Sequence, residues 1–381
     1  PGGVCPPSTS HPARHSLSPI PRTFGSMTID DQPKLYKTFS FRVKDATSGK
    51  RLVSLGNKVN TVWNYCNEIS KCSAERRPKW ITKKELRDLT KGASRELGLS
   101  SQVIQEVIDE FIIKRRRLGK PRLRWRVSHG PKRSLGWVPF TNQDIDTSKR
   151  GIVVLRSQPF RIWQHRDIEG KIASGNFSQD ARGRWYCNVV CEIKRPQITS
   201  RTNVVGIDLG FKTVATAHNA PDFNQGAFYR DIEPKLAEAQ RRGRKRQVRS
   251  IHAKVANRRK DALHKYSRAV VNDAGAVFVG NISSMWQIKS GNAKATLDVG
   301  WSMLRNFLKY KCDHAGVAFA EVDERYTTQS CSECAGLGGP KGREGLGVRQ
   351  WVCGCCGTVH DRDHNAAINI ARLGCETLGL I

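Results

Sequence analysis

Residues 331–370 read CSECAGLGGPKGREGLGVRQWVCGCCGTVHDRDHNAAINI and contain two Cys-x-x-Cys pairs, an acidic turn and a helical pattern. The pairs are Cys331 with Cys334 and Cys353 with Cys356, eighteen residues apart. Four cysteines at this spacing are typical of tetrahedral zinc coordination. The small residues Ala335 and Gly357 follow the pairs, where the backbone must turn back toward a metal. The segment therefore predicts a zinc ribbon, and the alternative is two disulfides.

The composition indicates a foldable protein with a polyanionic partner. The 381 residues include 65 Lys and Arg against 34 Asp and Glu, a net charge of +31, yet 38% are hydrophobic. This length suits two or three domains, and this charge favours nucleic acid over a membrane surface. Apart from the four predicted zinc ligands, the other eight of the twelve cysteines are scattered, which is typical of a reducing compartment and argues against disulfides. The longest apolar runs are too short to span a membrane.

The N-terminal half predicts a β domain that contains helices. Residues 1–26 are rich in Pro and Ser and are expected to be a disordered or non-native extension, with Met27 as the start. Residues 34–42 alternate as a strand, 50–70 and 100–117 have helical spacing, and 121–193 form a series of strand-like runs beginning with LRWRV. A small barrel or sheet is the simplest arrangement of these runs.

Two features of this half have alternative interpretations. The basic end of the 100–117 helix suits a phosphate backbone, but cations also stabilise a solvated helix C-terminus. Four tryptophans recur among arginines and could stack on bases or fill the core, the latter being commoner in β domains. They are Trp125, Trp137, Trp163 and Trp185.

The C-terminal half predicts an α/β layout. Residues 203–217 are expected to form two strands, the first ending in Asp208 and the second following a turn at Gly210, and further strands are expected at 276–282 and 317–322. A long basic helix is expected at 233–268 and an amphipathic helix around Trp301. The charge of the 233–268 segment exceeds what solvation requires and favours a helix that follows phosphates. Reactive groups in such folds gather beyond the carboxyl ends of the strands. Asp208 and Glu324 follow two of the expected strands there.

Three segments together resemble the TnpB family, transposon-encoded RNA-guided nucleases related to compact type V CRISPR effectors. They are IDLG at 207–210, YTTQSCSEC at 326–334 and WVCGCCGTVHDRDHNAAINI at 351–370. The resemblance implies a split RuvC (RNase H-like) nuclease domain with an inserted zinc ribbon, plus an N-terminal β-barrel (wedge) interrupted by a helical recognition lobe. The implied boundaries are 27–50 and 119–200 for the wedge, 51–118 for the lobe, 201–326 and 358–381 for RuvC, and 327–357 for the ribbon.

The resemblance also implies catalytic carboxylates. Asp208 matches the first, and Asp363 matches the last, with Asp361 as the alternative. The family's usual glutamate at the end of the middle strand is missing, because this chain has Gly280 there. We expect Glu324 to reach across this glycine and complete a site for two Mg²⁺ ions. The open alternatives are that Glu321 or Asp323 supplies the missing ligand, or that the nuclease is inactive.

The function expected from the resemblance is magnesium-dependent, RNA-guided cleavage of DNA beside a short flanking motif. The partners would be a guide RNA and a double-stranded DNA target, with no membrane, in the prokaryotic cytoplasm at the nucleoid. Nucleic-acid contacts are expected from Arg242, Lys245, Arg249, Arg258 and Arg259. The alternatives are an inactive, repressor-like RNA-guided DNA-binding protein, or a guide-independent zinc-ribbon accessory protein of transposition. The oligomeric state does not follow from the sequence.

Overall fold

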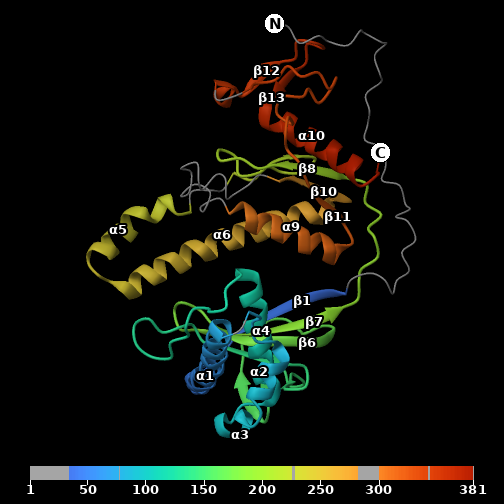
Figure 1. Cartoon of the computed structure of the whole chain (residues 1–381). Helices are drawn as coiled ribbons and strands as arrows, with labels where there is room; N and C mark the ends of the chain where they lie inside the picture. Colours follow the sequence, from blue (N-terminus) through green and yellow to red (C-terminus); the bar gives the residue numbers. More distant parts are fainter. Residues whose placement is uncertain (1–33, 77, 225–227, 282–299, 342–343, 381) are drawn as a thin grey trace. The chain divides into compact units, whose positions relative to one another are not determined.

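The computed structural model of the chain describes residues 34–76, 78–224, 228–281, 300–341 and 344–380 (Figure 1). These residues form two compact units, one from Lys34 to Lys194 and the other from Arg195 onward. The expected N-terminal extension, 1–26, lies outside the described residues. Within the described parts of the chain, every helix is too short or too polar to cross a membrane.

The first unit is built on two antiparallel sheets. One has the order β1-β7-β6-β2 and the other the order β3-β4-β5. The bounds are β1 Leu35–Arg42, β2 Trp137–Thr141, β3 Ile145–Asp146, β4 Ile152–Leu155, β5 Gln158–Arg161, β6 Lys171–Gln179 and β7 Trp185–Ile193. Alternate residues of β7, Trp185 and Cys187 among them, are buried in the core. The β-rich character is as expected, and closure into a barrel remains a prediction.

Helices pack beside these sheets. They are α1 Ala46–Arg76, α2 Lys83–Leu89, α3 Ala93–Leu97 and α4 Ser101–Leu118. The Ser100 side chain caps α4 by accepting a hydrogen bond from Val103 N, and Gly119 ends the helix in the left-handed conformation. The sequence pattern located α1 and α4. It missed α2 and α3, which are short and contribute one buried side chain, Leu86.

The run LRWRV, at 123–127, is not a strand. Its backbone lies along α1, and polar α1 side chains take the place of a neighbouring strand. Asn67 exchanges hydrogen bonds with Leu123 N and O at 2.8 and 2.9 Å. Asn64 does the same with Arg126 N and O, both at 2.8 Å. The run is extended because its backbone groups are satisfied by amides, a pairing that hydrophobic alternation does not reveal.

The second unit contains a mixed sheet with the order β11-β10-β8-β9. The bounds are β8 Val204–Asp208, β9 Thr216–His218, β10 Ala276–Gly280 and β11 Ala318–Val322. Strand β10 runs parallel to both neighbours, while β9 is antiparallel to β8. The strands preceding Asp208 and Glu324 therefore flank β10, and all three end at the same edge of the sheet. The last predicted residue of the middle strand, Ile282, lies outside the described residues.

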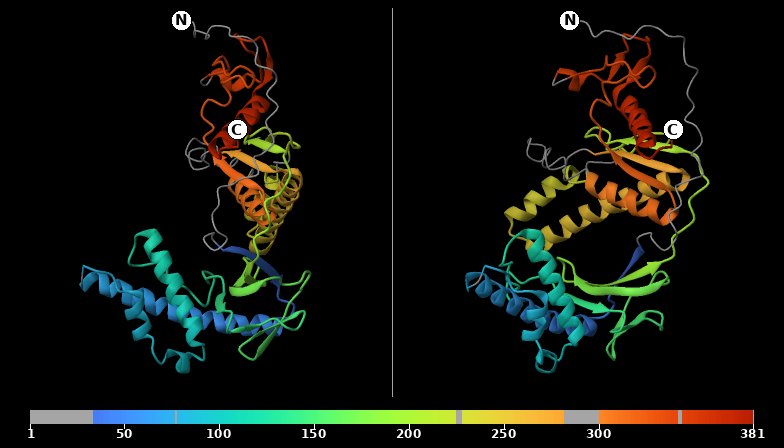
Figure 2. Two further views of the ribbon diagram at one scale, coloured as in Figure 1. Left: turned by 90° about the vertical axis from the view of Figure 1, so that its right-hand side faces the viewer. Right: turned by 45° about the vertical axis from the view of Figure 1, so that its right-hand side comes forward.

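Helices cover both faces of this sheet (Figures 1 and 2). Val205 and Ile207 of β8 pack in one core with residues of α6 (Lys245–Asp273) and α9 (Trp301–Ala315). Val204 packs in a separate core with residues of α10 (Arg362–Thr377). Because strand side chains alternate, even-numbered β8 and β10 residues, including Asp208, belong to the α10 face.

The basic segment 233–268 forms two helices rather than one. Helix α5, Glu233–Arg241, is separated from α6 by Gly243, whose φ of +63° favours glycine. The described residues also contain the 3₁₀ turns η2 Arg230–Ile232 and η4 Glu344–Gly347, and the paired strands β12 Gln350–Val352 and β13 Val359–Asp361.

Candidate metal centres

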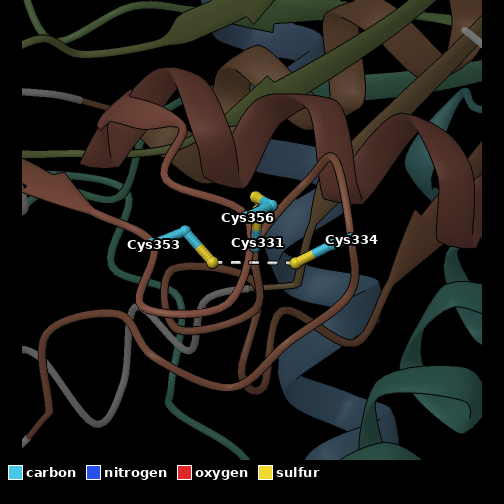
Figure 3. A group of neighbouring side chains, drawn as sticks. All are labelled: Cys331, Cys334, Cys353 and Cys356. Carbon is cyan, nitrogen blue, oxygen red and sulfur yellow. Dashed lines mark hydrogen bonds between the residues drawn. The ribbon is translucent and has the colours of Figure 1, made fainter. Parts of the chain in front are cut away.

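The four ribbon cysteines converge on one point (Figure 3). The Sγ atoms of Cys331 and Cys356 are 3.6 Å apart, as are those of Cys334 and Cys353, and all four lie within 4.8 Å of one another. Sulfurs about 2.3 Å from a tetrahedral zinc ion would lie about 3.8 Å apart. The cluster therefore fits a zinc-sized ion, and these four residues could hold it.

Identical backbone turns position the two cysteine pairs. In the first, Cys331 O accepts from Ala335 N and Cys331 N donates to Gly336 O, both at 2.9 Å. In the second, Cys353 O accepts from Gly357 N and Cys353 N donates to Thr358 O, again at 2.9 Å. Ala335 and Gly357 both have positive φ, 61° and 72°. The small residues that follow each pair in the sequence occupy this left-handed position.

Two further side chains contact the sulfurs. His360 Nε2 lies 3.0 Å from Cys331 Sγ. Hydrogen bonds with the side chain and backbone of Thr358 lower the pKa of Cys356 to about 6. The Thr358 contacts thus favour the metal-binding thiolate form of Cys356, whereas burial raises the pKa of Cys331 to about 12.

Two buried asparagines attach the base of the ribbon to α10. The Nδ2 atoms of Asn365 and Asn369 each donate to Thr327 O and Ser330 O, at 2.8–3.1 Å. Asn365 Oδ1 also accepts from Ser332 N at 2.9 Å. Sequence reasoning missed both residues. The available signal was a pair of asparagines four residues apart in a helix, where asparagine is unfavourable without a specific partner.

Close packing of α10 on β8 brings Asp363 toward Asp208. A Cβ at Gly206 would lie 2.1 Å from Ala367 O and 2.7 Å from Ala371 N, so only glycine allows this approach. At the other end of the helix, Gly374 packs on the ring of Phe278. Ile370, one turn before Gly374, lies near Gly280 at the end of β10, so α10 runs antiparallel to β10 and its first turn, which contains Asp363, lies toward the carboxyl ends of the parallel strands.

The side chain of Glu324 occupies the space above Gly280. A Cβ at position 280 would lie 2.7 Å from Glu324 Oε2 and 3.4 Å from Ile370 Cδ1. Gly280 pairs with Val322 at the end of β11, and Val279 pairs with Ile207, which makes Gly280 level with Asp208. The Glu324 carboxylate therefore extends over the middle strand toward Asp208.

The charges of Glu324 and Asp363 act on the buried carboxyl group of Asp208. Burial, followed by the charges of Glu324 and Asp363, raises the pKa of Asp208 to about 7. Burial also raises the pKa of Glu324, and the nearby Arg305 opposes this shift. Asp363 is paired with Arg349 of the ribbon, whose Nη1 lies 2.8 Å from Asp363 Oδ2. Like charges held together in this way are typical of a cation site.

The alternative acidic residues are engaged elsewhere. Asp361 is the N-cap of α10 and accepts hydrogen bonds from Asp363 N and His364 N. Glu321 pairs with Arg305 at 3.3 Å, and its odd position in β11 belongs to the α9 face. Asp323 is exposed and accepts from Arg325 N at 3.1 Å.

The five basic residues expected to contact nucleic acid differ in exposure. Lys245, Arg249 and Arg258 are exposed on α6. Arg242, at the C-cap of α5, is paired with Glu238 at 2.9 Å. Arg259 is half-buried, and its Cδ packs against Gly300.

Comparison with known proteins supplies two family models and several relatives. The model described as "Cas12f1-like, TNB domain" matches residues 301–370, and "Probable transposase" (OrfB_IS605) matches residues 188–285. A Streptomyces pristinaespiralis protein named "Putative RNA-guided DNA endonuclease" is 30% identical over 313 residues, 77% of this chain and 75% of that protein.

Two more similarities involve Cas12f1. The "CRISPR-associated endodeoxyribonuclease Cas12f1" of Sulfoacidibacillus thermotolerans is 26% identical over 239 residues, 54% of this chain and 56% of that protein. A cryo-EM structure of a Cas12f1-sgRNA-target DNA complex aligns with 88% of this chain and 99% of that one, at 16% identity and a TM-score of 0.36.

Proposed function

This chain belongs to the TnpB family, whose relatives are named as RNA-guided DNA endonucleases, and on that premise we propose that it cuts guide-matched DNA beside a short flanking motif. Its partners would be a guide RNA and a double-stranded DNA target. The guide would read the sequence by base pairing while the protein holds the backbone. The +31 charge supports a nucleic-acid partner. The nucleoid location remains a prediction.

The proposed nuclease site consists of Asp208, Glu324 and Asp363. Two Mg²⁺ ions held there would activate water and stabilise the leaving oxygen of a phosphodiester. Asp208 is the central ligand in this proposal, because both other carboxylates raise its pKa. Arg349 pairs with Oδ2 of Asp363 and would compete with an ion for that oxygen. The ribbon cysteines would hold a structural zinc ion.

The observation that carries the proposal is the fit between Gly280 and Glu324. The Cβ of a glutamate at position 280 would lie 2.7 Å from Glu324 Oε2. The side chains of these two glutamates therefore cannot occupy this space together. The chain therefore has a carboxylate beside Asp208 although the usual strand position lacks one. Without this carboxylate, the inactive alternative would be favoured.

The proposal is tested with protein purified together with its RNA. Sequencing that RNA identifies the guide, and a matched plasmid library identifies the flanking motif. We expect magnesium-dependent cutting that Asp208→Ala and Glu324→Ala each reduce about 100-fold or more, as loss of a metal ligand should.

The matched control is Glu321→Ala, a glutamate of β11 paired with Arg305 on the other face. It should cut nearly as well as the wild type. Guide-dependent binding without any cutting by the wild type would establish the repressor-like alternative. Absence of bound RNA from freshly expressed protein would favour the guide-independent accessory protein.

A further inference from the structure

A groove in the first unit lies beside the C-terminal end of α4. Its volume is about 400 Å³, within the range of ligand sites. We call it the Trp125 groove, and its lining includes the buried Leu123, four further apolar residues and five cations. The further apolar residues are Trp63, Leu118, Trp125 and Leu135, and the cations are Lys114, Arg124, Arg126, Lys132 and Arg133. Its described lining includes no acidic residue.

The walls of this groove are fixed before any ligand arrives. The backbone on both sides of Trp125 is held by α1, through Trp63 Nε1 to Arg124 O at 3.3 Å and through Asn64 to Arg126. Arg126 Nη2 donates to Leu135 O at 2.8 Å and thereby joins the two edges of the groove. A rigid wall lowers the entropic cost of binding.

The exposed groups suit a nucleotide. Trp125 is 45% exposed and Leu118 and Leu135 are 55% and 51% exposed, although each stands beside cations. Phosphates of a duplex would need only the cations and would leave the indole in water. An unpaired base would cover the indole while its phosphate meets Arg124 and Lys132, both exposed. The groove is concave, which does not suit a flat membrane surface.

We propose that the Trp125 groove binds an unpaired nucleotide, with the base stacked on Trp125 and the phosphate held by Arg124 and Lys132. This proposal rests on the proposed function and adds a specific subsite to it. The nucleotide belongs either to the guide RNA or to an unpaired DNA strand. In both cases the ligand offers the same two groups, a base that stacks on the indole and a neighbouring phosphate that binds the cations.

The test is strand binding by the full chain after removal of bound RNA. Labelled twelve-nucleotide single strands, as RNA and as DNA, are compared with abasic strands of the same length. Trp125→Ala should weaken binding of base-bearing strands about tenfold and leave abasic strands unchanged, while Trp125→Phe should retain most of the affinity. Arg124→Ala with Lys132→Ala should weaken both kinds of strand and reduce the salt dependence.

Trp163→Ala is the matched control, because Trp163 is a 58% exposed tryptophan of the same unit with Lys44 Nζ 4.4 Å from its ring centroid. It should bind as the wild type does. Equal losses on base-bearing and abasic strands, or unchanged binding by Trp125→Ala, would overturn the proposal.

The source of the nucleotide is identified in the complete complex. A photo-crosslinking amino acid at position 125 should crosslink to one nucleotide of the RNA or of the DNA, and a crosslink to protein alone would contradict the proposal. Cleavage is recorded for the same variants. If the wild type cuts no DNA, the proposed nuclease function is wrong. The strand-binding assay still tests whether the Trp125 groove binds a nucleotide.

Discussion

The two candidate metal centres of the second unit flank the start of α10, and they are built differently. The cysteine sulfurs lie within 4.8 Å of one another because two identical local turns aim them. The carboxylates come from three elements far apart in the chain and meet through the packing of α10 on the sheet. Among the described residues, only the cysteines form so tight a group. One centre is encoded locally, while the other depends on the whole domain.

The largest effect is expected from breaking the local centre. Cys353→Ser with Cys356→Ser should remove zinc binding, for which structural sites contribute about 10–16 kcal/mol. Because Asn365 and Asn369 join the ribbon to α10, unfolding of the ribbon should also disturb Asp363 and abolish cutting. Metal content measures the loss of zinc, limited proteolysis the unfolding of the ribbon, and a cleavage assay the loss of cutting. Cys72→Ser, in the other unit, is the control, and retained cutting by the double variant would disprove the coupling.

The second prediction breaks the packing that assembles the carboxylates. Gly206→Ala would direct a Cβ into the α10 backbone, 2.1 Å from Ala367 O, and should destabilise the protein by about 3 kcal/mol. Gly280→Ala is the matched variant, because its closest contact is the movable end of Glu324. It should unfold at nearly the wild-type urea concentration but cut more slowly. Equal stability of the two variants would contradict this account of α10 packing.

The third prediction weakens the connection between the two centres. The double variant Asn365→Ala with Asn369→Ala leaves Thr327 O and Ser330 O without these donors. This should lower the free energy of unfolding by about 1–3 kcal/mol for each carbonyl left without a partner. Zinc content should be unchanged while cutting falls. Arg372→Ala, which removes a hydrogen bond to Asn369 within α10, is the control. Full cutting by the double asparagine variant would show that the ribbon and the carboxylates are independent.

The fourth prediction concerns the stability of the metal-free protein. Burial and like charges raise the pKa of Asp208 from 3.8 to about 7, so the folded state binds more protons than the unfolded state between these values. Stability should therefore fall as pH rises from 4 toward 7 and level off above it. Asp208→Asn should make stability less dependent on pH. At pH 8 without magnesium, this variant should unfold at a higher temperature than the wild type. Thermal melts at several pH values test this, and identical profiles would contradict it.

Sequence reasoning located what depends on local pattern. The cysteine turns and the strand ending in Asp208 each follow from neighbouring residues. It missed what depends on distant partners: the run at 123–127 is held by α1 amides, and Asn365 and Asn369 act on residues about forty positions earlier. The break at Gly243 was missed because an isolated glycine does not by itself end a helical pattern. The reach of Glu324 was expected from strand order, and its catalytic role remains a prediction.

The central claim is that Glu324 replaces a glutamate at position 280. The most direct test is to place a glutamate at position 280 and remove the one at position 324. Magnesium-dependent cleavage of guide-matched DNA is measured for the wild type, Glu324→Ala, and Gly280→Glu combined with Glu324→Ala. Removing the Glu324 side chain frees the space that a side chain at 280 needs, so the combined variant should regain cutting lost by the single one. Wild-type cutting by Glu324→Ala, or no recovery in a folded, RNA-bound combined variant, would contradict the claim that these two positions share one catalytic role.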